Sequence, residues 1–161
     1  MLLDKVLSKC PWTLVLLFKL KDLGGEATAF EIAKELGVRT YVVKRGMWWL
    51  KKFKAVEEDA SVEPKKFRIT VEAIRALEKI ILNRWVKGNT IAILHGNMYY
   101  VFICRSKGIV VKTVPKEIVD NVRLYVMKGV SDINALYEKT GISKPLLSTA
   151  LRILRTLSKQ P

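Results

Sequence analysis

The side chains best suited to recognition chemistry gather in one stretch, residues 37–56. Within it, basic, hydroxyl-bearing and aromatic residues fall between apolar residues that recur at helical spacing. The candidate contacts are Arg39, Thr40, Tyr41, Lys44, Arg45 and Lys51. Because a guanidinium group can form two hydrogen bonds to guanine, Arg39 and Arg45 are candidates for base contacts. Lys44 and Lys51 are candidates for contacts with phosphate.

Residue types that carry catalysis or bind metal ions are sparse. His95 is the only histidine, and no cysteine or carboxylate stands at a spacing that pairs with it. Cys10 and Cys104 lack the C-x-x-C spacing of a zinc or redox site. The sequence also lacks a glycine-rich phosphate loop. We therefore expect a protein that is not an enzyme and has no metal and no cofactor.

The charge balance favours a polyanionic partner. The 161 residues include 29 Lys and Arg against 15 Asp and Glu, a formal net charge of +14. There are 18 basic and 11 acidic residues up to Gly88, and 11 and 4 after it, so each part has a net charge of +7. Nucleic acid is the expected partner, and a basic chain without such a partner is the alternative. The single Gln and single His beside many Lys and Arg suggest a thermophilic source.

No apolar segment is long enough for a membrane helix. The run at residues 12–18 is too short, and residues 1–9 lack the order of charged and apolar residues found in a signal peptide. The absence of a cysteine framework fits a reducing compartment. We expect a cytoplasmic, nucleoid-associated protein with no membrane partner.

Apolar periodicity and turn residues predict the elements that present residues 37–56. The expected elements are helices at 12–23, 29–36 and 39–52, a hairpin with strands at 55–58 and 66–70, and a helix from 71 to about 86. Thr28 suits the N-cap of the second helix, and Gly37 suits the turn before the third. Gly46 lies inside the third helix, where it costs about 1 kcal/mol relative to Ala and suggests a close approach by another backbone. This order predicts a winged helix with a recognition helix at 39–52.

Two features bear on what such a winged helix would bind. The wing carries Lys65, Lys66 and Arg68, which are candidates for phosphate contacts, but four acidic residues lie in the same hairpin. Trp48 and Trp49 stand where a recognition helix is usually polar. We expect them to pack against the following helix or against a partner.

The helix expected from residue 71 to about 86 has more apolar residues than a small winged helix needs. The ones proposed for an interface are Ile74, Leu77, Ile81 and Trp85. One interpretation is a homodimer that presents two recognition helices to two half-sites. The other is packing against the second half of the same chain.

Residues 89–161 are expected to form a second domain, after a first domain at 1–88. The expected elements are a three-stranded meander at 90–95, 98–104 and 109–114, and helices at 115–127, 132–139 and 144–158. The last two helices match the first helix-turn-helix in pattern, and their candidate DNA contacts are Lys144, Ser148, Thr149 and Arg152. Leu146 and Ile153 are apolar where a DNA-reading helix is normally polar. This unit is therefore a candidate for binding either DNA or protein.

The core and turn positions of the first half support a family resemblance. The positions are Gly37, Val38, Val43, Met47, Leu50 and Val56, followed by the wing. With them, residues 12–86 resemble the winged-helix domains of archaeal and bacterial transcriptional regulators of the broad MarR/PadR-like class. The resemblance implies a sequence-selective binder of double-stranded DNA, often a dimer, with contacts from the first turns of the recognition helix.

The expected fold is mainly α with a small β component (α+β). It combines an N-terminal winged helix with a C-terminal three-stranded meander and a tri-helical helix-turn-helix. The expected function is that of a DNA-binding transcriptional regulator. The alternative is a winged-helix subunit that contacts protein in a transcription or replication assembly, and RNA binding is a third possibility.

Overall fold

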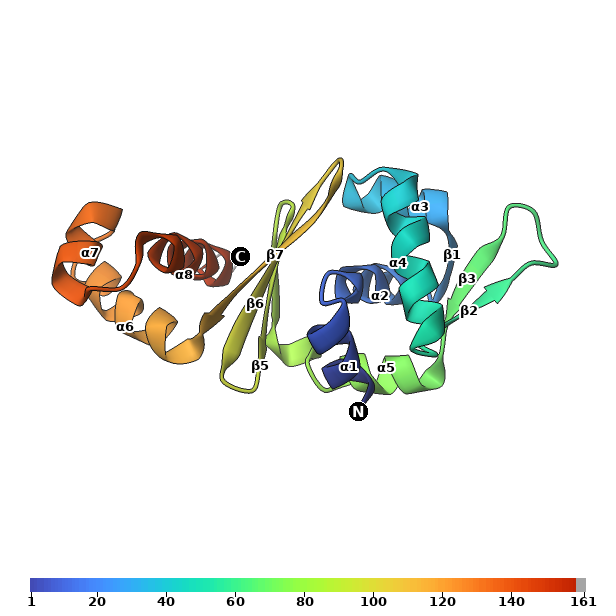
Figure 1. Ribbon diagram of the computed structural model, residues 1–161, viewed down its shortest axis with the longest axis horizontal. Coiled ribbons are helices and arrows are strands. Elements are labelled where there is room, and N and C mark those ends of the chain that lie inside the picture. Colours follow the sequence, from blue (N-terminus) through green and yellow to red (C-terminus); the bar gives the residue numbers. More distant parts are fainter. Residues whose placement is uncertain (159–161) are drawn as a thin grey trace. The chain divides into compact units, whose positions relative to one another are not determined.

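The computed structural model describes residues 1–158 and has an α+β fold (Figure 1). Within these residues, eight α-helices and one short 3-10 helix accompany seven strands in two antiparallel sheets. The chain divides into two compact units. The first comprises residues 1–82 and 102–111, and the second comprises residues 83–101 and the chain from residue 112 onward.

Helix α2 forms the centre of the first unit. The helices of this unit are α1 (Leu2–Lys9), α2 (Thr13–Asp22), α3 (Ala29–Leu36), α4 (Thr40–Lys52) and α5 (Val71–Glu78). Seven of the ten α2 residues are buried, and the other four helices all contact α2. Each fully buried large apolar side chain contributes roughly 1.5–3 kcal/mol, so the enclosure of α2 is a main source of stability.

The turn between α3 and α4 follows the pattern expected from the sequence. The Thr28 side chain accepts a hydrogen bond from the Glu31 backbone N–H at 3.1 Å, which caps the start of α3. Gly37 ends α3 in the left-handed conformation, with φ of 70°. Because a side chain is strained at this φ, glycine suits the sharp turn that leads into α4.

A small sheet follows α4 in the first unit. Its strands are β1 (Glu26–Thr28), β2 (Val56–Asp59) and β3 (Lys66–Ile69), in the order β1-β3-β2. Strands β2 and β3 lie where the hairpin was expected. The sequence pattern missed β1, because three residues between a glycine pair and a helix cap carry too little alternation to identify a strand.

The helix expected from residue 71 to about 86 is wrong beyond residue 78. Thr70 caps α5 as expected, since its side chain accepts from the Ala73 N–H at 3.2 Å, but α5 ends at Glu78. A 3-10 helix (Ile81–Asn83) and strand β4 (Arg84–Lys87) follow. These residues form a strand because they pair with the neighbouring strand, where Trp85 lies opposite Ala92. The spacing of apolar residues in the sequence does not reveal such a distant partner.

The second unit joins a sheet to three helices. Its remaining elements are β5 (Thr90–His95), β6 (Met98–Arg105), β7 (Gly108–Pro115), α6 (Lys116–Met127), α7 (Ile133–Thr140) and α8 (Lys144–Leu157). The strand order is β4-β5-β6-β7, so the sheet has four strands where three were expected. The far ends of β6 and β7, with the turn between them, belong to the first unit. Residues 159–161 of the expected second domain lie outside the described residues.

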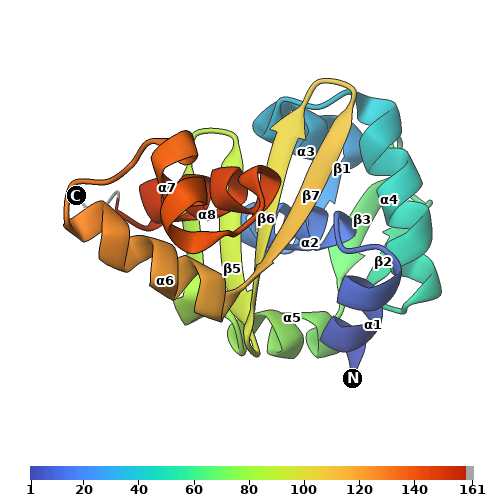
Figure 2. The same ribbon diagram turned by 60° about the vertical axis from the view of Figure 1, so that its left-hand side comes forward.

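Helix α8 is enclosed by the rest of its own unit (Figure 2). It contacts α6, α7, β4 and β5. Leu147 and Leu151 are buried along one stripe, and Ile153 along another. The apolar Ile153, which is unusual for a DNA-reading helix, is therefore explained by packing within the chain.

None of the helices within residues 1–158 has the length and apolar character needed to cross a membrane.

Gly46 marks the closest approach between α4 and α2. A Cβ at this position would lie 2.1 Å from Leu16 Cδ1 and 2.9 Å from the Trp12 ring. Leu16 is fully buried, so it has little room to move aside. The close approach expected from the sequence is real, and it is made by side chains rather than by another backbone.

We predict that Gly46→Ala destabilises the protein even though alanine favours a helix. Overpacking costs about 1–3 kcal/mol and exceeds the gain of about 1 kcal/mol in helix propensity, because Leu16 and Trp12 must both shift. Thermal unfolding should show a Tm lower by several degrees. Lys44→Ala, on the exposed face of the same helix, is the matched control and should leave Tm nearly unchanged. An unchanged or higher Tm for Gly46→Ala would contradict the packing explanation.

Candidate nucleic-acid interface

Helix α4 has one buried face and one exposed polar face. The buried residues are Val42, Val43, Gly46, Met47 and Leu50. The exposed residues are Tyr41, Lys44, Arg45, Trp48, Lys51 and Lys52, and Thr40 is half-buried beside them. The apolar residues recur at helical spacing and face the core, which leaves the cations on the opposite side.

The start of α4 presents cations that the protein does not neutralise. Arg39 and Lys44 are exposed, and neither forms an ion pair with any other residue in the part of the chain that the structure describes. Arg45 is also exposed, but its guanidinium carbon lies 5.2 Å from the centre of the Trp12 ring. This cation–π contact holds Arg45 against the residue that precedes α2.

A groove of about 520 Å³ runs beside the exposed face of α4. It is lined by the junction of β1 and α3, by α4 and by the β2–β3 hairpin. The lining residues are Thr28, Ala29, Phe30, Thr40, Lys44, Trp48, Lys51, Glu58, Glu63, Pro64, Lys65 and Phe67. The groove brings together four of the nucleic-acid contacts proposed from the sequence. They are Thr40, Lys44, Lys51 and Lys65.

Lys51 is partly neutralised by an acidic residue of the same groove. Its Nζ donates to Glu58 Oε2 at 2.7 Å. This hydrogen bond lowers the pKa of the Glu58 carboxyl below its ordinary value of 4.5. Lys51 can therefore contact a phosphate only at the expense of this ion pair, which the sequence did not reveal.

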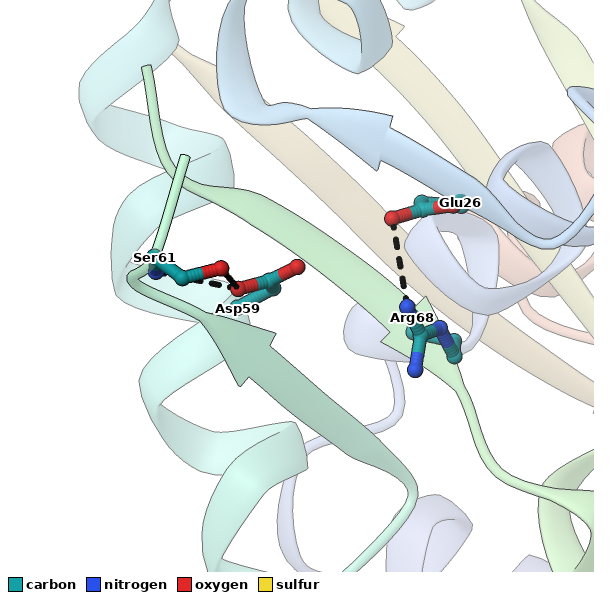
Figure 3. A network of polar contacts seen from close by, with 4 residues as sticks. All are labelled: Glu26, Asp59, Ser61 and Arg68. Carbon is teal, nitrogen blue, oxygen red and sulfur yellow. Dashed lines mark hydrogen bonds and ion pairs between the residues drawn. The ribbon is translucent and has the colours of Figure 1, made fainter. Parts of the chain in front are cut away.

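The β2–β3 hairpin, which the sequence predicted to be a wing, and the adjoining strand β1 have a mixed charge (Figure 3). The Arg68 guanidinium donates to Glu26 Oε1 at 3.5 Å, across the β1–β3 pair. Asp59 accepts from both the backbone N–H and the hydroxyl of Ser61, and these hydrogen bonds lower the pKa of its carboxyl. Lys66 is half-buried and lies opposite Asp59 in the sheet. Of the three basic residues of this hairpin, Lys65 alone is both exposed and outside these pairings, within the described residues.

An aromatic cluster interrupts the polar face of α4. Trp48 is 50% exposed, and the Lys52 Nζ lies 3.9 Å from the centre of its ring. Trp49 is half-buried. Its ring packs edge-on against Trp48, with ring centres 5.0 Å apart, and stacks on Phe53, with ring centres 6.1 Å apart. Phe30, 65% exposed, lines the same groove as Trp48. The two tryptophans thus differ, since only Trp48 is open to a partner.

The turn between β6 and β7 was not identified from the sequence as part of this surface. The Arg39 backbone N–H donates to the Ser106 carbonyl at 2.8 Å, and the Tyr41 hydroxyl donates to the Lys107 carbonyl at 3.4 Å. Residues 39 and 106 are far apart in the chain, and no local pattern links them.

Comparison of the chain with protein-family models, curated proteins and solved structures finds no significant match. Candidate functions therefore rest on the geometry of the described residues. Among those residues, no group of three His, Cys, Asp or Glu side chains lies close enough together to bind a metal ion.

Helices α7 and α8, expected from the sequence to form a second helix-turn-helix, place the candidate contacts differently from the expectation. Lys144 and Ser148 are exposed. Thr149 is only 5% exposed and its hydroxyl donates to the Pro145 carbonyl at 3.1 Å, so it was wrongly proposed as a DNA contact. Arg152 is half-buried, with its Nη1 3.5 Å from the Thr90 hydroxyl.

The residues proposed for a partner interface are also divided. Leu77 is 1% exposed and Ile153 is fully buried, so these two are wrong as interface residues, because they pack within their own units. Ile81 is exposed and follows α5. Half-buried positions are Ile74, Trp85 and Leu146. With α5 ending at Glu78, the long apolar helix expected to form the dimer is absent from the described residues, and the homodimer stays a prediction.

We predict that the Lys51–Glu58 ion pair makes stability depend on pH in the acid range. The ionised carboxylate stabilises the fold above pH 4.5, and this contribution is lost as the pH falls through the lowered pKa of Glu58. Glu58→Gln should therefore lower stability at neutral pH by about 1 kcal/mol or less, since both side chains reach solvent. In acid, thermal unfolding of the two proteins should converge. A difference that grows as the pH falls would be inconsistent with this explanation.

Proposed function

We propose that the protein is a winged-helix DNA-binding protein, a transcriptional regulator that binds duplex DNA without catalysing a reaction on it. The observation that carries the proposal is the polar face of α4. It presents Lys44, Arg45, Lys51 and Lys52 to solvent, opposite a face that is buried in the core. A helix of this kind can enter the major groove with its cations toward bases and phosphates.

The order of the elements supports this proposal. Helix α3, the left-handed turn at Gly37 and helix α4 have the order of a helix-turn-helix, and the β2–β3 hairpin follows in the position of a wing. In helix-turn-helix proteins the first residues of the second helix reach base edges. Arg39, Thr40 and Lys44 are then the residues nearest the bases, and Lys65 is a phosphate contact from the wing.

The charge of the chain supports the same partner. A net charge of +14 attracts the phosphate backbone regardless of base sequence. Neutralising phosphates releases counterions, so affinity falls as salt rises, with a slope that reports the number of contacts. If α4 binds DNA, the number of its phosphate contacts therefore determines how steeply the affinity falls with salt concentration.

A specific observation favours a second candidate function. Trp48 and Phe30 are at least half exposed and line one groove. Exposed aromatic side chains in a groove are typical anchors at protein interfaces. The alternative is a winged-helix subunit that contacts another protein of a transcription or replication assembly through this groove.

We predict that replacing the cations at the start of α4 weakens DNA binding. The measurement is a salt titration of labelled duplex DNA against the wild type and the triple variant Arg39→Ala, Lys44→Ala, Arg45→Ala. Loss of up to three contacts should reduce the salt slope by about 2–3 units and the affinity at least tenfold. Circular dichroism checks the fold, because Arg45 also packs on Trp12.

The matched control removes the same charge elsewhere in the first unit. Lys5, Arg75 and Lys79 are exposed and lie on α1, on α5 and just after α5, outside helix α4. Their triple alanine variant should keep a salt slope close to that of the wild type. If both triple variants lose affinity equally, binding depends on net charge alone and the recognition-helix assignment is wrong. If the wild type does not bind duplex DNA at low salt, the proposal fails and the Trp48 groove becomes the surface to test for a protein partner.

A separate prediction concerns Lys51. Glu58→Gln removes the charge that pairs with Lys51 and leaves the side-chain volume nearly unchanged. We expect tighter binding of duplex DNA and a salt slope steeper by about one unit, because the released ammonium can contact a phosphate. An affinity unchanged across the salt range would mean that Lys51 lies outside the DNA contact surface.

A further inference from the structure

The turn between β6 and β7 lies against the beginning of α4. Ser106 and Lys107 connect the last residue of β6, Arg105, to the first residue of β7, Gly108. Both views show this turn beside the α3–α4 connection (Figures 1 and 2). Two hydrogen bonds join it to the first turn of α4, from the Arg39 N–H to the Ser106 carbonyl and from the Tyr41 hydroxyl to the Lys107 carbonyl.

The turn is fixed in place by the strand that leads into it. Phe102 and Ile103 are buried in the first unit, with exposures of 0% and 2%. Cys104 is buried as well, and burial raises the pKa of its thiol. Since moving the turn would expose these side chains to water, the turn and the start of α4 form one surface.

The surface so formed is basic. Arg105, Ser106 and Lys107 are exposed. Neither Arg105 nor Lys107 forms an ion pair with a side chain among residues 1–158, and the same holds for Arg39. The β2–β3 wing differs, because Glu26 pairs with Arg68 there.

We infer that the β6–β7 turn is a second phosphate-binding element, which contacts the DNA backbone beside the point where α4 enters the major groove. The inference rests on the proposed function and extends its contact surface to residues far from α4 in the sequence. The partner is the phosphodiester backbone, because Arg105 and Lys107 offer charged donors. Contacts of this kind set the position and orientation of a recognition helix without reading the base sequence.

The test compares duplex binding by the double variant Arg105→Ala, Lys107→Ala with that of the wild type. The hydrogen bonds from the turn to α4 use backbone carbonyls, so these substitutions remove the charges and keep the attachment. We expect the salt slope to fall by about two units and the affinity at moderate salt to fall roughly tenfold. Hydroxyl-radical footprinting should show lost protection of the backbone at one edge of the site.

Two further variants test whether any loss of binding comes from lost phosphate contacts of the turn or from a change in net charge. The charge-conserving variant Arg105→Lys, Lys107→Arg should restore the slope and the footprint. The Lys5, Arg75 and Lys79 triple alanine variant should keep both, although it removes more charge. Thermal unfolding of each protein shows whether the fold is retained.

The outcomes distinguish this inference from the proposed function. If the wild type binds duplex DNA and the turn variant binds with the same slope and footprint, the turn does not contact the backbone and only this inference is wrong. Tighter binding by the turn variant would also overturn it, because the turn would then obstruct the groove. If the wild type does not bind duplex DNA, both proposals fail.

Discussion

A helix that is apolar on nearly every side must be enclosed, and the first unit is arranged around that requirement. Helix α2 is covered by four other helices, and it also contacts β1 and β3. The closest approach is to α4, where Gly46 leaves room for Leu16 and the Trp12 ring. Because the apolar face of α4 packs against α2, its opposite face is exposed to solvent and can carry charged residues. The polar surface is thus a consequence of how the core is packed.

The basic residues of this surface differ in whether an acidic side chain neutralises them. In the β2–β3 hairpin, Arg68 forms an ion pair with Glu26 and Lys66 lies opposite Asp59, while Lys51 is paired with Glu58. At the start of α4, by contrast, Arg39 and Lys44 have no ion-pair partner within the described residues. Surface ion pairs contribute little to the stability of the fold, but they determine which basic side chains are available to bind a polyanion. The positive electrostatic potential is therefore strongest at the start of α4. The net charge of the chain alone would not reveal this uneven distribution.

Local patterns predicted the parts of the fold that local interactions determine. Thr28 caps α3 and Gly37 turns the chain, since each acts through its own backbone neighbours. The α4 candidates Lys44 and Arg45 were correctly expected to be exposed, because apolar spacing identifies the opposite face. The sequence pattern failed where distant partners decide. The sequence of strand β4 resembles the end of a helix, and only its pairing with β5 makes it a strand. Thr149 was expected to be exposed, but the contacts of α8 with other helices and with the sheet bury it.

The path of the chain between the two units has a consequence for the order in which they can form. Residues 102–111 complete the first unit, but residues 83–101, which precede them, belong to the second. Domains generally fold as the ribosome releases them, beginning at the N-terminus. Here the first unit cannot finish when residue 82 emerges from the ribosome, because the Ser106 carbonyl that accepts the Arg39 N–H has not yet emerged. The start of α4 therefore gains its last backbone partner only after part of the second unit has left the ribosome.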